Sequence, residues 1–335
     1  MGSYEASVGR ALDPEQKDLL DHEEHCSADP ERLAAAGAER GHQVRIQRGG
    51  IGSALYTVSE LRPETPDTVV RMGKEGRERL GTSEEFEGVL DTRVTRSELA
   101  EEEARKSGEF VERLQDNASQ RHLIVLAPHG GAIEPHTDEQ AEHVATRLGA
   151  KRASVWLCRG YRADSLSPRR WHATSDDIDP RSFPALGSVF DRGFVDAVSF
   201  HGFTRAGREN EIVVGGAADD RLRRHVAAVL TQAVAGTPLS VHIAPLGDPL
   251  GGTDGRNIVN RITANGRGGV QIEQGPAARD EYALVIADAI VRVYRARLRR
   301  RSAYRALRRL LIRLMRRFGS RADASQPSTP TAAGQ

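Results

Sequence analysis

The sequence predicts an α/β protein with three layers, in which helices cover both faces of a mostly parallel, mixed sheet, and a small β-rich module precedes it. From residue 121 onward, apolar runs alternate with amphipathic stretches, a pattern typical of buried strands joined by crossover helices. Residues 43–96 instead hold short β-prone runs between Gly, Pro and charged turns. A hydrophobic content of 38% with 28% charged residues fits a globular chain.

The first 42 residues are polar and acidic, and we interpret them as an N-terminal extension without a core face. They contain His22-Glu23-Glu24-His25-Cys26, whose spacing matches no known metal-ligand pattern, so we interpret it as a solvated helix face. The module over 43–96 follows, with strands expected near 44–46, 54–58, 68–72 and 88–90. Residues 97–114 are predicted to form a charged helix.

The main domain is expected over residues 97–298. An apolar run at 122–127 predicts its first strand, and a helix is expected at 139–148. Further elements follow in chain order: strands at 153–158, 195–200, 211–214, 239–244 and 269–272, and helices at 219–235 and 277–297. The absence of an apolar run in the first 20 residues and of any stretch of about 20 apolar residues favours a cytoplasmic protein.

Chemically active side chains follow three of the predicted strands. His129 comes just after the first strand, within a segment that continues to Glu134; His201 follows another strand, and Glu273 ends a third. Because sites in open α/β sheets lie at the carboxyl ends of strands, these side chains are candidates to meet. Two imidazoles and a carboxylate suit a catalytic zinc ion, and the second carboxylate suits a general base. Ordinary turn and cap positions explain the same residues equally well.

Several motifs resemble the poly-γ-glutamate hydrolase family of phage and bacilli. The first is Leu126-Ala-Pro-His129-Gly-Gly-Ala-Ile-Glu134-Pro135, and the others follow in order: Trp171-His172-Ala173-Thr174-Ser175, Phe200-His201-Gly202, Val214-Gly215-Gly216-Ala217, Asn257-Ile258-Val259-Asn260-Arg261 and Gly269-Val270-Gln271-Ile272-Glu273. The resemblance spans residues 109–294. It implies a zinc-carboxypeptidase-like core that cuts γ-glutamyl amide bonds, with His129, Glu134 and His201 as zinc ligands and Glu273 as the general base.

A γ-glutamyl substrate presents carboxylates, for which Arg is the natural partner. We therefore expect Arg261 to bind substrate, with Asn257 beside it. Arg170 and His172 are further candidates, His172 as a possible donor to the oxyanion of the scissile carbonyl; structural roles remain open for these residues. The alternatives to a γ-glutamyl hydrolase are an amidohydrolase of small N-acyl amino acids or cell-wall peptides, and a non-catalytic binding module that retains the fold.

The charge is distributed unevenly along the chain. From Arg292 to the end there are 13 arginines and one acid, which gives +12, and the whole-chain value of +1 leaves about −11 for the rest. An acidic body should repel a long polyanion unless the groove itself is basic. Residues 299–335 are expected to form a basic amphipathic helix, in which Tyr304, Leu307, Leu311, Leu314 and Phe318 share a face, followed by a disordered end from residue 325. Contact of residues 299–318 with an anionic membrane and packing on the protein are both open, whereas nucleic-acid binding is disfavoured.

Overall fold

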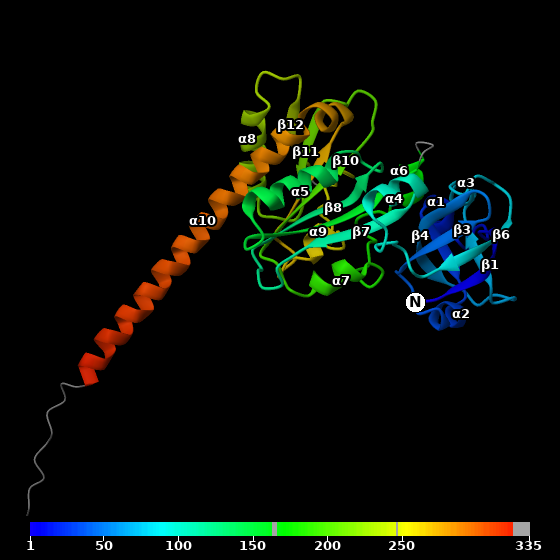
Figure 1. Ribbon diagram of the computed structural model, residues 1–335, viewed down its shortest axis with the longest axis horizontal. Coiled ribbons are helices and arrows are strands. Elements are labelled where there is room, and N and C mark those ends of the chain that lie inside the picture. The colour runs from blue at the N-terminus through cyan, green and yellow to red at the C-terminus, as the bar shows by residue number, and fades with distance from the viewer. Residues whose placement is uncertain (163–165, 246, 324–335) are drawn as a thin grey trace, which may run out of the picture. The chain divides into compact units, whose positions relative to one another are not determined.

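The computed structural model describes residues 1–162, 166–245 and 247–323; beyond residue 304 only some side chains are described. The chain divides into two compact units, Met1–Val291 and Arg292–Gln335. The first unit contains a closed β-barrel and a separate mixed sheet with its helices (Figure 1). The family motifs found in the sequence all lie in the mixed sheet and the segments that join its strands.

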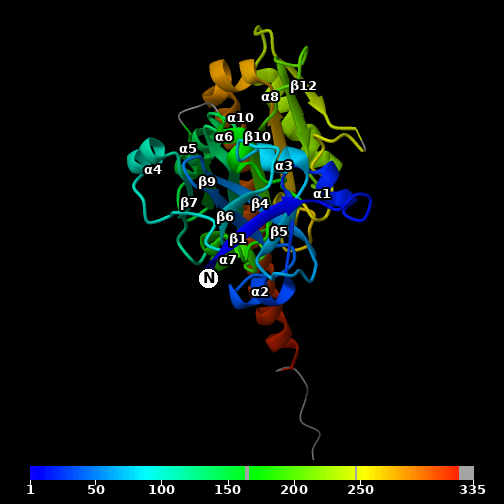
Figure 2. The same cartoon turned by 90° about the vertical axis from the view of Figure 1, so that its right-hand side faces the viewer.

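The barrel is formed by the first strands of the chain, in the order β1-β5-β2-β4-β3-β6. Figure 2 shows several of these strands, coloured blue to cyan, curving around one another. Its elements are β1 (Ser3–Arg10), α1 (Lys17–Asp21), β2 (His25–Ala28), α2 (Pro30–Ala35), β3 (Gln43–Arg48), β4 (Gly52–Leu61), β5 (Val69–Met72), α3 (Lys74–Glu78) and β6 (Phe86–Asp91).

The prediction that residues 1–42 form a polar N-terminal extension is wrong, because these residues belong to the barrel. Strand β1 buries Tyr4, Ala6 and Val8 in the barrel core and exposes polar residues between them. A barrel strand points only every second side chain inward, so half of its residues are polar. When the hydropathy is averaged over the segment, this alternation resembles that of a polar extension. The β-rich module begins at Ser3.

The second sheet is mostly parallel, as the βα alternation predicts. Its strand order is β12-β11-β13-β10-β8-β9-β7, with antiparallel pairs only at β11·β13 and β7·β9 among the described strands. The strands are β7 (Phe110–Gln115), β8 (Leu123–Gly131), β9 (Ala153–Gly160), β10 (Asp196–Gly202), β11 (Glu211–Gly215), β12 (Ser240–Ile243) and β13 (Gly269–Gln274).

Helices pack against this sheet and bury its apolar side chains. Ile124 and Leu126 of β8 join one hydrophobic cluster with side chains of α6 (Ser167–Trp171), α7 (Pro184–Phe190) and α9 (Ile258–Arg261). Helix α5 (Thr137–Leu148) packs against β8, β9 and β10, and α8 (Asp220–Ala233) against β11 and β12. The alternation expected from residue 121 onward is thus confirmed as a mixed α/β arrangement.

The helix expected over residues 97–114 is shorter and is followed by a strand. Helix α4 (Glu101–Ser107) ends at Gly108, which has a φ of 69° and so turns the chain in a conformation that other residues rarely adopt. Phe110 and Val111 then belong to β7, which pairs with β9 at the edge of the sheet. The apolar residues interpreted as one face of a helix are therefore buried from a strand.

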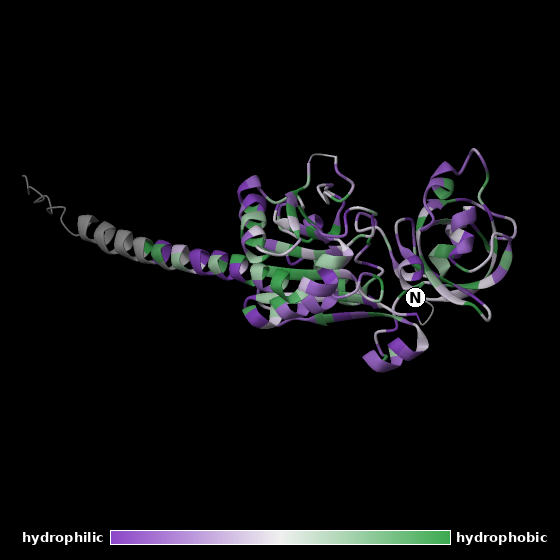
Figure 3. Cartoon of the chain, turned by 90° about the horizontal axis from the view of Figure 1, so that it is seen from above, coloured by the Kyte–Doolittle hydropathy of each residue, from purple (hydrophilic) through white to green (hydrophobic). Residues whose placement is uncertain are grey.

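The last helix, α10 (Pro276–Asp323), begins in the first unit and continues into the second. Its first turns are tied to α5, because Gln140 Nε2 donates to the Ala283 carbonyl (3.0 Å) and His143 Nε2 lies 2.8 Å from Asp288 Oδ1. The coloured part of α10 carries both hydrophobic and hydrophilic residues (Figure 3).

Two residues of the expected amphipathic face, Tyr304 and Leu307, are exposed, by 69% and 54%. The side chains of Leu311, Leu314 and Phe318, and the end from residue 325, lie outside what the structure describes. Within the described residues, no helix combines the length and the apolar character required to span a bilayer.

Candidate active site

Three neighbouring strands bring the predicted residues together. Strands β13, β10 and β8 are adjacent in the sheet, and they carry Glu273, His201 and His129 near their carboxyl ends. His201 and Glu273 are direct partners in the parallel register of β10 and β13. Because parallel strands end at the same edge, residues separated by 144 positions in the chain, such as His129 and Glu273, reach one cavity.

Glu134 lies between the two histidines. Its backbone N–H donates to the His129 carbonyl (2.8 Å), a tight turn that brings the carboxylate back over the end of β8. Oε1 lies 3.1 Å from His129 Nδ1, and Oε2 lies 3.6 Å from His201 Nδ1. The backbone N–H of Gly202 also donates to Oε2 (2.9 Å). Although burial alone raises the pKa of Glu134, the neighbouring His129 and His201 hold it well below its usual value.

Both histidines are oriented through their other ring nitrogen. His129 Nε2 donates to the Ala173 carbonyl (2.8 Å), which leaves the lone pair of the neutral ring on Nδ1. His201 Nε2 lies 2.7 Å from the Ser199 hydroxyl, so its Nδ1 also faces Glu134. Hydrogen bonds of this kind behind the ring are typical of histidines that bind metals.

This group has the donor chemistry of a zinc site, two imidazole nitrogens and a carboxylate. Ligand atoms at zinc bond lengths of about 2.0–2.1 Å lie roughly 3.3 Å apart in a tetrahedron. Each histidine faces a different oxygen of Glu134, and these two contacts, 3.1 Å from Oε1 to His129 Nδ1 and 3.6 Å from Oε2 to His201 Nδ1, are close to that separation. All three residues are buried, and the residues present therefore fit a zinc ion.

His172 is a fourth ligand candidate beside this group, and the third that offers a nitrogen. Its ring centroid lies 4.2 Å from that of His129, and ligand atoms of His129, Glu134 and His172 lie within 4.8 Å of one another. Burial lowers the pKa of His172, but the Glu24 carboxylate, which accepts a hydrogen bond from Nδ1, raises it to about 9. The structure thus allows His172 to act as a ligand or as a donor to a substrate.

Glu273 lies in the same cavity, on the strand next to His201. Its Oε1 accepts a hydrogen bond from Gln271 Nε2 (2.9 Å). Burial raises the pKa of Glu273 to about 7, a value suited to a group that takes up and releases a proton at neutral pH. The cavity has a volume of about 430 Å³, and its other polar lining residues include Thr174, Ser175, Asp176, Asp248, Asp254 and Asn257.

The arginines predicted to bind substrate are elsewhere. Arg261 does not line the cavity; its guanidinium donates to the Ile178 carbonyl (3.0 Å) and lies over the ring of Phe190. Arg170 is only 2% exposed and is also absent from the cavity wall. Asn257, by contrast, does line it and donates to Gln271 Oε1 (3.1 Å). No Arg or Lys is present among the described residues of the cavity wall.

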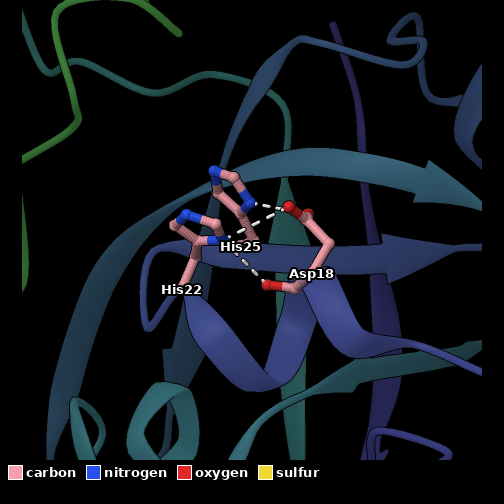
Figure 4. Close-up of side chains that lie close together, drawn as sticks. All are labelled: Asp18, His22 and His25. Carbon is pink, nitrogen blue, oxygen red and sulfur yellow. Dashed lines mark hydrogen bonds and ion pairs between the residues drawn. The ribbon is translucent and has the colours of Figure 1, made fainter. Parts of the chain in front are cut away.

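The segment interpreted as a solvated helix face, His22 to Cys26, is the sequence feature most clearly misread. Figure 4 shows the rings of His22 and His25 turned toward the carboxylate of Asp18, with distances of 3.2 and 2.7 Å from their Nδ1 atoms. His22 is exposed, but His25 is buried and its Nε2 lies 3.1 Å from Asp177 Oδ2. Glu24 is 17% exposed on its side chain and binds His172. Only the barrel's contact with the second sheet explains this burial, and no spacing rule reveals it.

A mixed α/β sheet that brings two histidines and two glutamates into one cavity suits hydrolytic chemistry, and a comparison with known protein families indicates a hydrolase. The family profile described as Poly-gamma-glutamate hydrolase matches residues 95–283. The chain belongs to this poly-γ-glutamate hydrolase family, as the motifs in the sequence indicate.

Individual relatives match more limited parts of the chain. The SPbeta prophage-derived UPF0714 protein YoqZ of Bacillus subtilis (strain 168) is 30% identical over 141 residues, which are 42% of this chain and 45% of YoqZ, so the chain spans less than half of that relative. A solved bacteriophage poly-gamma-glutamate hydrolase is 26% identical, with 59% of this chain and 90% of that one covered and a TM-score of 0.45. A solved structure of zinc-free YNDL is 23% identical, with 58% and 95% covered and a TM-score of 0.43.

Proposed function

We propose that this protein is a zinc-dependent hydrolase that cleaves γ-glutamyl amide bonds. The observation that carries the proposal is the position of Glu134 between His129 and His201, with Glu273 in the same cavity. The family to which the chain belongs supports the substrate class, and the donor set of two imidazoles and one carboxylate supports zinc. The helix-covered mixed sheet supports the further expectation of a three-layer, carboxypeptidase-like core.

His129, Glu134 and His201 would hold the zinc ion. When bound, it would act as a Lewis acid that polarises the scissile carbonyl and makes water more acidic. Glu273 takes the proton of the attacking water on a carboxylate oxygen and delivers it to the leaving amine nitrogen. His172 donates a hydrogen bond to the oxygen of the scissile carbonyl as negative charge develops there.

The cavity favours short substrates over long polyanions. Its described wall carries Asp176, Asp248 and Asp254 but neither Arg nor Lys, and like charges repel a chain of carboxylates. Asn257 offers an uncharged amide to a substrate in this wall. We therefore propose short γ-glutamyl peptides as substrates, with cell-wall peptides that contain such a bond and small N-acyl amino acids as the second candidates.

The test is to load the purified protein with zinc and to measure amine release from γ-glutamyl di- and tripeptides, poly-γ-glutamate and N-acetylglutamate. We expect one zinc ion per chain, cleavage of short γ-glutamyl peptides and loss of activity with a chelator. If the zinc-loaded protein cleaves none of these substrates, the hydrolase proposal is overturned, and a binding module that retains the fold becomes the better explanation.

A further inference from the structure

The barrel places a carboxylate, that of Glu24, behind two residues of the cavity wall. Glu24 immediately precedes β2, and both of its oxygens bind residues of the cavity wall. Oε1 accepts a hydrogen bond from His172 Nδ1. Oε2 accepts two from Thr174, one from the backbone N–H (2.8 Å) and one from the hydroxyl (3.1 Å). The side chains of Glu24 and His172 are 17% and 34% exposed, so their mutual hydrogen bond is partly shielded from solvent.

Other barrel residues hold the same segment. The guanidinium of Arg79, which is 1% exposed, donates to the carbonyls of Arg169 (2.5 Å) and His172 (3.2 Å). Gln43 Nε2 donates to the carbonyl of Asp177 (2.7 Å). The backbone on both sides of His172 is therefore anchored to the barrel, and Glu24 binds the side chain itself.

His172 transmits this anchoring to the reaction centre. Its ring lies against that of His129. Because Nδ1 is bound to Glu24, Nε2 is the ring nitrogen that remains for a group in the cavity. A carboxylate behind an imidazole selects the orientation of the ring, and a small misplacement of a catalytic group can reduce turnover about 100-fold.

We propose that Glu24 is a positioning residue, supplied by the barrel, that fixes the ring of His172 so that Nε2 faces the substrate. The inference rests on the proposed function for its catalytic consequence. It makes the barrel part of the enzyme's active site, although the family profile matches only residues 95–283 and so does not include the barrel.

The test is a double-mutant cycle in the zinc-loaded full chain. We expect Glu24→Gln to lower kcat on a γ-glutamyl peptide by about 10- to 100-fold, with KM and zinc content close to wild type. In a His172→Ala background the same substitution should change kcat by less than about twofold, because the two residues act through one interaction. Glu23→Gln is the matched control. Glu23 is next to Glu24 in the sequence, but its side chain is exposed and lies 3.7 Å from exposed Arg169 rather than beside His172.

Equal losses in both backgrounds, or a kcat of Glu24→Gln within twofold of the control, would overturn the proposal. Thermal unfolding of each variant shows whether the substitution acts only by destabilising the fold. If Glu24→Gln does not fold, Glu24→Asp replaces it, because Asp keeps the charge but has a shorter side chain. The ¹⁵N chemical shifts of the His172 ring test, without substrate, whether Glu24 controls the state of that ring. If wild type cleaves nothing, a shift of these signals in Glu24→Gln still supports the positioning role, and unchanged signals contradict it.

Discussion

At the scale of single residues, Glu134 and Glu273 show how different surroundings give one residue type different charge states. Glu134 is placed between two imidazoles and accepts a backbone N–H, so its negative charge is stabilised. Glu273 is also buried, but its carboxylate accepts a hydrogen bond from the neutral amide of Gln271, and burial raises its pKa to about 7. The first is suited to bind a cation and the second to exchange a proton.

Replacement of Glu273 by Gln should remove the base and leave the metal site intact. We expect zinc content to stay at the wild-type level and kcat to fall by about 10²–10⁴-fold, the contribution typical of general bases. Metal analysis and steady-state kinetics on a short γ-glutamyl peptide measure the two quantities. Glu209→Gln, on the exposed turn before β11, is the control; near wild-type turnover in Glu273→Gln would show that Glu273 is structural.

Alanine substitutions should distinguish the zinc ligands from His172. We expect His129→Ala and His201→Ala to bind no zinc at stoichiometric concentration, since each removes one of three protein ligands. His172→Ala should retain zinc and lose turnover. Titration with a chromophoric chelator measures the affinity of each variant. Loss of zinc from His172→Ala together with retention in His201→Ala would assign His172 as the third ligand instead.

At the scale of elements, charged pairs hold strands and helices in the positions that the site requires. Asp116 follows β7, Arg192 follows α7, and the two form a paired contact with distances of 2.6 and 2.8 Å. The hydrogen bonds from Arg192 lower the pKa of Asp116 to about 2. This pair closes the end of the sheet opposite to the cavity, because β8 begins shortly after Asp116 and carries His129 at its other end.

Asp116→Asn should therefore destabilise the protein in a pH-dependent way. The folded-state pKa lies below the unfolded value near 3.9, so the ionised form stabilises the fold above about pH 4. We expect the variant to lose about 1.5 kcal/mol of unfolding free energy at pH 7, a value typical of hydrogen bonds to charged groups. The difference from wild type should shrink as the pH falls from 4 toward 2. Urea unfolding at pH 7, 5 and 3 measures it, with exposed Asp191→Asn as the control; a difference independent of pH would contradict this origin.

At the scale of the whole molecule, the two compact units have opposite charge. The arginines from Arg292 onward give the second unit a strong positive charge, whereas the remainder is acidic. Exposed Tyr304 and Leu307 add apolar surface beside exposed Arg308 and Arg309. We propose that the helix over residues 299–318 contacts an anionic membrane, where each basic residue contributes about 1 kcal/mol.

Deletion of residues 300–335 tests this contact. We expect the full chain to sediment with vesicles that contain phosphatidylserine at low salt, and the truncated chain to remain in the supernatant with unchanged hydrolytic activity. Raised salt should weaken binding, because charges are screened beyond about 8–10 Å. The double variant Arg308→Gln with Arg309→Gln should bind vesicles more weakly than the full chain and more strongly than the truncated chain. If the full chain does not bind vesicles at low salt and the truncation lowers the melting temperature, the helix packs on the protein instead.

The main sheet could be predicted well because its signal is local. Buried parallel strands are continuous apolar runs, and each strand between residues 123 and 274 overlaps an expected one. The prediction failed at β7 and at the first barrel strands, where short, half-polar strands resemble helices or extensions. The physical reason is that a period-two pattern over few residues is weak until pairing partners are known.

The sequence alone indicates which residues can do chemistry, since His129, His201 and Glu273 lie at the carboxyl ends of strands that meet at one sheet edge, and Glu134 follows the first of them. Only the tertiary structure shows which other side chains contact these four residues. The sequence predicts Arg261 and Arg170 in the cavity, but both are held elsewhere, whereas Glu24, far before the first motif, binds His172. The reason is that strands follow from local patterns, while the direction of a side chain and the docking of a separate barrel depend on packing between segments far apart in the chain.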